Sequence, residues 1–102
     1  MAAKDRRLEL NAKLKELTPN VYFQPPATVK MKYPAIRYEL ARIDLTSADN
    51  GPYFLDRAYQ VTVIDADPDS EIVEAISKWP MCSFNRHYQA DNLNHYVFII
   101  YY

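Results

Sequence analysis

An α+β domain is the fold class that this sequence predicts: a mixed, mainly antiparallel sheet of about four to five strands with two helices packed on one side. Apolar residues recur at helical spacing in residues 4–17 and 68–78, and they alternate with polar residues in other segments. The order of segments is helix, two strands, helix, two strands. This order favours antiparallel strand pairs in one twisted sheet under the helices. A length of 102 residues fits a single domain over residues 1–102.

The first part of the chain predicts a helix and a half-buried strand. Leucines at helical spacing predict an amphipathic helix over residues 4–17, with an inner face of Leu10, Leu14 and Leu17. Val21–Phe23 is expected to be short and extended, before two prolines enforce an exposed connection. Alternation from Tyr33 to Ile43 predicts a strand whose buried face carries Ile36, Tyr38 and Leu40.

The middle of the chain predicts a polar loop, a return strand and a second helix. Asp44–Pro52 is longer than a tight turn, so we expect a loop between two antiparallel strands. Tyr53–Ile64 is the predicted return strand, with an inner face of Tyr59, Val61 and Val63. The helix over residues 68–78 is expected to bury Ile72, Val73, Ile76 and Trp79.

Two further strands complete the prediction. Cys82–Gln89 alternates, with Phe84 and Tyr88 expected together on one face. After a turn at residues 90–92, His95–Tyr102 forms the last strand. The strands therefore come in two pairs on either side of the second helix.

Composition restricts the classes of function. The net charge is −1 and the basic residues are scattered, so bulk charge gives no reason to expect binding to nucleic acid or to an anionic membrane. The single glycine, Gly51, excludes a glycine-rich phosphate loop. No apolar segment approaches the ~20 residues that span a bilayer, and no signal-peptide pattern is seen. The single cysteine, Cys82, favours a reducing, cytoplasmic compartment.

Three alternate aspartates, Asp65, Asp67 and Asp69, resemble the start of a calcium-binding loop. The EF-hand pattern then requires glycine and glutamate at positions where this chain has Ser70 and Ile76. Helix capping explains the run better. Asp67 is expected to be the N-cap, with proline at the first helical position. We therefore expect no metal site.

The other reactive side chains form no recognisable catalytic set. His87 and His95 lie on strands that are expected to be neighbours, but two imidazoles alone make a poor metal site. Cys82 lies between Met81 and Phe84, at the start of an apolar strand, where cysteine usually acts as a small buried hydrophobe. We expect no enzymatic activity and no cofactor.

The last strand is apolar on both faces. No lysine or arginine is interleaved with its aromatic residues, which argues against a stacking platform for single-stranded nucleic acid. In a chain of this length, such a strand indicates that one face meets another subunit. The candidate interface combines this strand with the polar loop and comprises Asp49, Asn50, Gly51, Tyr53, Tyr96, Ile99 and Tyr101.

Four motifs taken together resemble one protein family. They are Tyr-Phe-Gln-Pro-Pro at 22–26, Met-Lys-Tyr-Pro-Ala-Ile at 31–36, and the longer segments 59–70 and 82–95. From Tyr22 onward, the chain is similar to small tail-completion proteins of long-tailed (siphovirus-type) bacteriophages, which are encoded among the head–tail joining genes. Within that group it most resembles the tail terminators.

This resemblance implies a structural virion protein without catalytic residues. Such terminators form a hexameric ring that caps the tail tube, ends its polymerisation and joins the tail to the head connector. The implied partners are further copies of the chain, the tail tube protein and a head-closure or connector protein. The implied location is the head–tail junction of the virion, after synthesis in the bacterial host cytoplasm. The family's fold, a mixed sheet with helices on one side and an extended hairpin, agrees with the elements predicted above.

Two other interpretations stay open. A head-closure or head–tail connector protein would contact the portal side rather than the tail tube. A soluble adaptor domain would bind an extended peptide by adding it as a strand to an exposed sheet edge.

Overall fold

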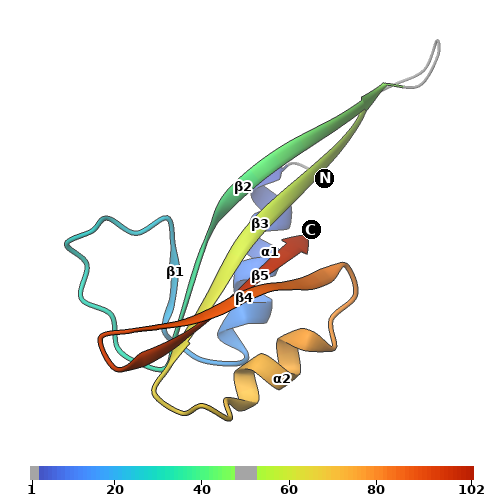
Figure 1. The fold of residues 1–102 in the computed structure, drawn as a ribbon. Coiled ribbons are helices and arrows are strands. Elements are labelled where there is room, and N and C mark those ends of the chain that lie inside the picture. Colours follow the sequence, from blue (N-terminus) through green and yellow to red (C-terminus); the bar gives the residue numbers. More distant parts are fainter. Residues whose placement is uncertain (1–2, 48–52) are drawn as a thin grey trace.

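The computed structural model describes residues 3–47 and 53–102 and confirms the α+β fold. The elements in chain order are α1 (Ala3–Lys15), β1 (Val21–Phe23), β2 (Ala35–Ser47), β3 (Tyr53–Asp65), α2 (Glu71–Ser77), β4 (Cys82–Ala90) and β5 (Leu93–Tyr101). The strands form one open sheet in the order β1-β2-β3-β5-β4 (Figure 1). Among the described strand pairs, only β1–β2 is parallel, so the sheet is mixed and mainly antiparallel.

Both helices pack against one face of the sheet, which we call the helix face. Strand residues alternate between the two faces, so every second residue of the central strands meets a helix. The buried cluster comprises Leu10 and Leu14 of α1, Ile72 and Ile76 of α2, and Ile36, Tyr38, Tyr59, Val61, Val63, Phe98 and Ile100 of the sheet. Burying each large apolar side chain contributes roughly 1.5–3 kcal/mol. The inner faces predicted for these elements are confirmed.

The opposite face, which we call the open face, has no helix packed on it in the described part of the chain. Its side chains follow from the strand register, which aligns Arg37 with Thr62 and Val97, and Glu39 with Gln60 and Ile99. Charged and amide groups lie on β2 and β3, and apolar groups lie on β5. The open face is therefore a mixed surface rather than a second core.

The β2–β3 hairpin is longer than the sequence indicated. The prediction of a loop from Asp44 is wrong, because β2 continues to Ser47, which pairs with Tyr53. Polar and apolar residues still alternate through Ile43, Asp44, Leu45 and Thr46, but the polar residues that follow favour a loop. The hairpin projects from the rest of the molecule, here called the body (Figure 1). The whole measures 52 × 24 × 23 Å.

The second helix is shorter than predicted, because α2 begins at Glu71 and its N-cap is Ser70, not Asp67. The Asp67 N–H donates to Asp65 Oδ1, and the Asp69 N–H donates to Asp67 Oδ1, both at 2.9 Å. Aspartate side chains commonly close such local turns. These two consecutive turns occupy the carboxylates of Asp65 and Asp67, so Asp67 does not cap the helix. The helix therefore begins further along the chain, at Glu71.

β4 is exposed on both faces, and the prediction of one shared face for Phe84 and Tyr88 is wrong because the register with β5 shifts between them. These side chains are 57% and 40% exposed. A β-bulge at Asn85 shifts the pairing of β4 with β5. Phe84 therefore opposes Phe98 on the helix face, whereas Tyr88 opposes His95 on the open face.

Candidate functional site

The polar-loop part of the candidate interface falls mostly outside the described residues. This holds for Asp49, Asn50 and Gly51. Tyr53 is the first residue of β3, and its pairing with Ser47 places it at the end of the hairpin furthest from the body. The described part of the hairpin is therefore its stem.

Tyr96 makes its contacts within its own chain. On the helix face, its hydroxyl donates a 2.7 Å hydrogen bond to the Pro68 carbonyl, and its ring centre lies 4.7 Å from that of His87. Burial raises the pKa of Tyr96, and the carboxylates of the loop that begins at Asp65 raise it further. The protonated hydroxyl thus ties the β3–α2 connection to β5.

Ile99 and Tyr101 are the candidate residues that lie on the open face. Both side chains are half-buried, beside the buried Val97 of the same strand. The Tyr101 hydroxyl donates to Asp44 Oδ2 at 3.5 Å, which connects β5 to the hairpin stem. These two residues therefore border the place where the hairpin leaves the sheet.

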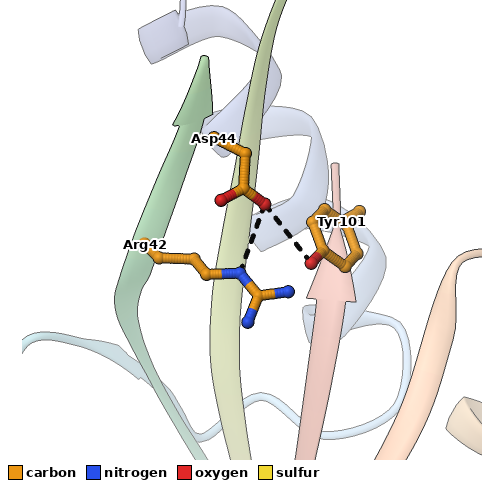
Figure 2. Close-up of polar contacts among 3 residues, drawn as sticks. All are labelled: Arg42, Asp44 and Tyr101. Carbon is orange, nitrogen blue, oxygen red and sulfur yellow. Dashed lines mark hydrogen bonds and ion pairs between the residues drawn. The ribbon is translucent and has the colours of Figure 1, made fainter. Parts of the chain in front are cut away.

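A small polar network occupies that place (Figure 2). Arg42 Nε donates to the same Asp44 Oδ2 at 3.3 Å, and the Arg42 guanidinium carbon lies 5.3 Å from the centre of the Tyr101 ring. The side chains of this ion pair are 57% and 49% exposed. Exposed pairs contribute about 0–1 kcal/mol. The network orients the side chains of the stem while adding little stability.

A depression of about 340 Å³ adjoins the network. Its lining comprises Arg6, Asp56, Arg57, Met81, Tyr101 and Tyr102. Arg6 Nε donates to the Tyr102 main-chain oxygen at 3.1 Å. One of the two arginines that line the depression is therefore already hydrogen-bonded within the chain. Sequence reasoning missed this depression because its residues come from four separate segments. No spacing pattern links them.

The structure separates the residues that the sequence suggested as metal ligands. His87 opposes Tyr96 on the helix face, and His95 opposes Tyr88 on the open face. The two imidazoles therefore lie on opposite sides of the sheet, although β4 and β5 are neighbours as predicted. In the part of the chain that the structure describes, no three His, Cys, Asp or Glu side chains gather as a metal-binding group.

Cys82 packs against the hydrophobic core at the start of β4 and is half-buried. Burial raises the pKa of its thiol. A raised pKa lowers the thiolate fraction, and the thiolate is the nucleophilic form of cysteine. The position agrees with the predicted packing role.

Comparison with known proteins finds no match among family models, curated proteins or solved structures. Within residues 3–47 and 53–102, no helix is long and apolar enough to cross a membrane. The fold belongs to the class of open α+β sheets, here with a projecting hairpin.

Proposed function

We propose that this chain is a structural virion protein, a phage tail terminator that forms a homo-oligomeric ring. The projecting hairpin carries the proposal. The molecule is 52 Å long and only 24 × 23 Å across, and the hairpin projects from the body (Figure 1). An isolated two-stranded ribbon is at best marginally stable in water. A ribbon that extends so far from its core gains most from contacts with another subunit.

The family resemblance supports the same proposal. Its motifs include residues 59–70, which span part of β3 and the turns before α2, and residues 82–95, which include β4. In the proposed ring, each copy contacts the next through two different surfaces, and such a contact closes when the rotation between copies allows it. The ring would cap the tail tube, end its polymerisation and join the tail to the head connector.

Head closure is the nearest alternative. A head-closure protein would use the same ring and hairpin but would contact the portal side. A peptide-binding adaptor is a second candidate, and the observation that favours it is the exposed β4 edge. Particle morphology separates the first two functions, and the presence of a ring separates both from a monomeric adaptor.

The test is electron microscopy of particles from a phage with a nonsense mutation in this gene. Tails of uncontrolled length beside full, unjoined heads are the expected result, because nothing would stop growth of the tube. Tails of normal length beside heads that have lost DNA would reject the terminator and favour head closure. A phage complemented with the intact gene is the control.

A further inference from the structure

Among the described strands, β4 presents an unpaired backbone edge. It is the outermost strand of the sheet and pairs on one side with β5. Residues 83–90 are all exposed. An edge strand of this kind offers a row of N–H and C=O groups to any strand that adds to it.

The turn between β4 and β5 determines which backbone N–H and C=O groups of β4 point away from the sheet. Asp91 and Asn92, with φ of 53° and 64°, form the tight turn between β4 and β5. Ala90, just before that turn, hydrogen-bonds to β5, and alternate residues back along the strand do the same. The N–H and C=O of His87 and Gln89 therefore point away from the sheet.

The opposite edge of the sheet is protected. β1 is three residues long and is followed by Pro25 and Pro26. The loop of residues 24–34 runs beside it, and the Lys32 N–H donates to the Tyr22 hydroxyl oxygen at 3.3 Å (Figure 1). Short strands, proline and covering loops are the usual means of blocking an edge. β4 contains neither proline nor lysine, and its bulge at Asn85 lies before His87 and Gln89, which leaves the outward groups of these two residues in regular alternation.

The hairpin stem carries a second free edge. β1 stops pairing with β2 at Tyr38, and Gln24 bonds to the Tyr38 carbonyl at 2.9 Å and to the Leu40 N–H at 3.3 Å. Beyond this point β2 pairs only with β3 in the described structure. The outer edge of residues 42–47 is thus unpaired. It spans about 20 Å at ~3.4 Å per residue.

Strand direction makes the two free edges compatible. β2 is antiparallel to β3, β3 to β5, and β5 to β4, so β2 and β4 run in opposite directions. Two copies placed side by side in the same orientation bring β2 of one antiparallel to β4 of the other. No copy has to be inverted, so the same contact can repeat around a ring.

The charges of the hairpin stem and of β4 are also complementary. Asp44 directly opposes Asp56 in the hairpin, and like charges in that position destabilise a strand pair. Arg42 forms an ion pair with Asp44, and among the described residues no ion pair reaches Asp56. The stem therefore has a carboxylate available to a cation from outside.

β4 supplies one such cation. Arg86 is the single arginine of β4, which contains no lysine, aspartate or glutamate. Arg86 is exposed, and its guanidinium carbon lies 5.4 Å from the centre of the Tyr88 ring. Arg86 opposes Val97, so it lies on the open face. Asp44 lies on that face too, because it contacts Tyr101 there. In a sheet that continues from one copy to the next, the open faces lie on the same side, so Arg86 and the neighbour's carboxylate pair would lie on one face.

We propose that β4 of one copy binds the β2 stem of a neighbouring copy's hairpin, so that the sheet continues from subunit to subunit. The occupant is a second copy of this chain, because both free edges, their directions and their charges belong to it. This inference rests on the proposed function, since it requires a homo-oligomer, and it names the contact that builds the ring.

The test compares His87→Pro with His87→Thr in the full chain. Both variants lose the imidazole contacts with Tyr96 and Asn94, but only proline loses the outward N–H. Light scattering coupled to size-exclusion chromatography measures the oligomeric state, and circular dichroism checks the fold. The expected result is a ring for the wild type and His87→Thr, and a monomer for His87→Pro.

A charge exchange tests the same contact without altering the backbone. Arg86→Asp alone and Asp44→Arg alone should each shift the ring toward monomer, because each places like charges together. The double variant should recover the ring mass. Recovery would support the pairing even if His87→Pro did not fold, and no recovery would overturn it.

The remaining outcomes separate this inference from the proposed function. A ring that survives His87→Pro overturns the β4 contact and leaves the ring intact. Loss of the ring in both His87 variants overturns strand addition, because the backbone N–H would then not be the deciding group. A wild-type chain that stays monomeric and binds an extended peptide overturns both proposals.

Discussion

The body and the hairpin of this molecule are stabilised by different interactions. In the body, Tyr38, Val61 and Phe98 are almost completely buried between the sheet and the two helices. In the hairpin stem, Ile43 is 43% exposed, and the described side-chain contacts are an exposed ion pair and its hydrogen bonds. Stability therefore resides in the body. Residues of the hairpin stem can therefore be substituted without loss of the fold.

The largest expected effect comes from matched isoleucines. Ile100→Ala, in the body, should lower the free energy of unfolding by about 2–5 kcal/mol, because it leaves a cavity in a packed core. Ile43→Ala, in the stem, should lower it by less than ~1 kcal/mol. Urea unfolding followed by circular dichroism measures both. Equal decreases in the free energy of unfolding would contradict this difference between body and hairpin, because they would mean that the stem is part of the core.

A smaller effect is expected from matched tyrosines. The Tyr38 hydroxyl donates to Asn11 Oδ1 at 2.7 Å inside the body. Tyr38→Phe should therefore cost about 1 kcal/mol, the usual net value of such a hydrogen bond. Tyr101→Phe removes only the 3.5 Å bond to Asp44 and should change stability little. A larger loss for Tyr101→Phe in thermal melts would place the stem network among the main stabilising contacts.

Alkaline pH should weaken the body through Tyr38. Burial raises the pKa of this hydroxyl above its ordinary value of 10.0. The folded chain then holds a proton that the unfolded chain releases, so stability is full below the unfolded pKa and falls as pH rises through the folded pKa. We expect stability to decline above pH ~10, and less steeply in Tyr38→Phe. Identical pH profiles would exclude Tyr38 as a cause.

The smallest effect is expected from shortening the hairpin. Replacement of residues 44–56 by a tight turn removes no member of the buried cluster. The free energy of unfolding should change by less than ~0.5 kcal/mol, while any ring should be lost. Calorimetry and light scattering measure the two properties on one sample. A large fall in melting temperature would show that the hairpin supports the body.

The sequence predicted the body better than the surface. Helical and alternating periods identified the buried faces, since burial itself imposes those periods, and Leu14, Val63 and Ile76 are buried as expected. The bulge at Asn85 and the exposure of β4 were missed, because exposed strands are under no such constraint. The extent of the hairpin was missed because the polar residues after Leu45 favour a loop. The helix start was misplaced because Asp67 suits a local turn as well as it suits an N-cap.

The bulge at Asn85 also bears on the tendency of this chain to aggregate. A long, flat edge strand is a template for uncontrolled stacking of identical chains into fibres. The extra residue bends β4 and interrupts its row of outward groups, since Phe84 and Arg86 are no longer in simple alternation. A growing stack would have to repeat that bend in every layer. The same irregularity that separates Phe84 and Tyr88 onto opposite faces thus lowers the risk of aggregation.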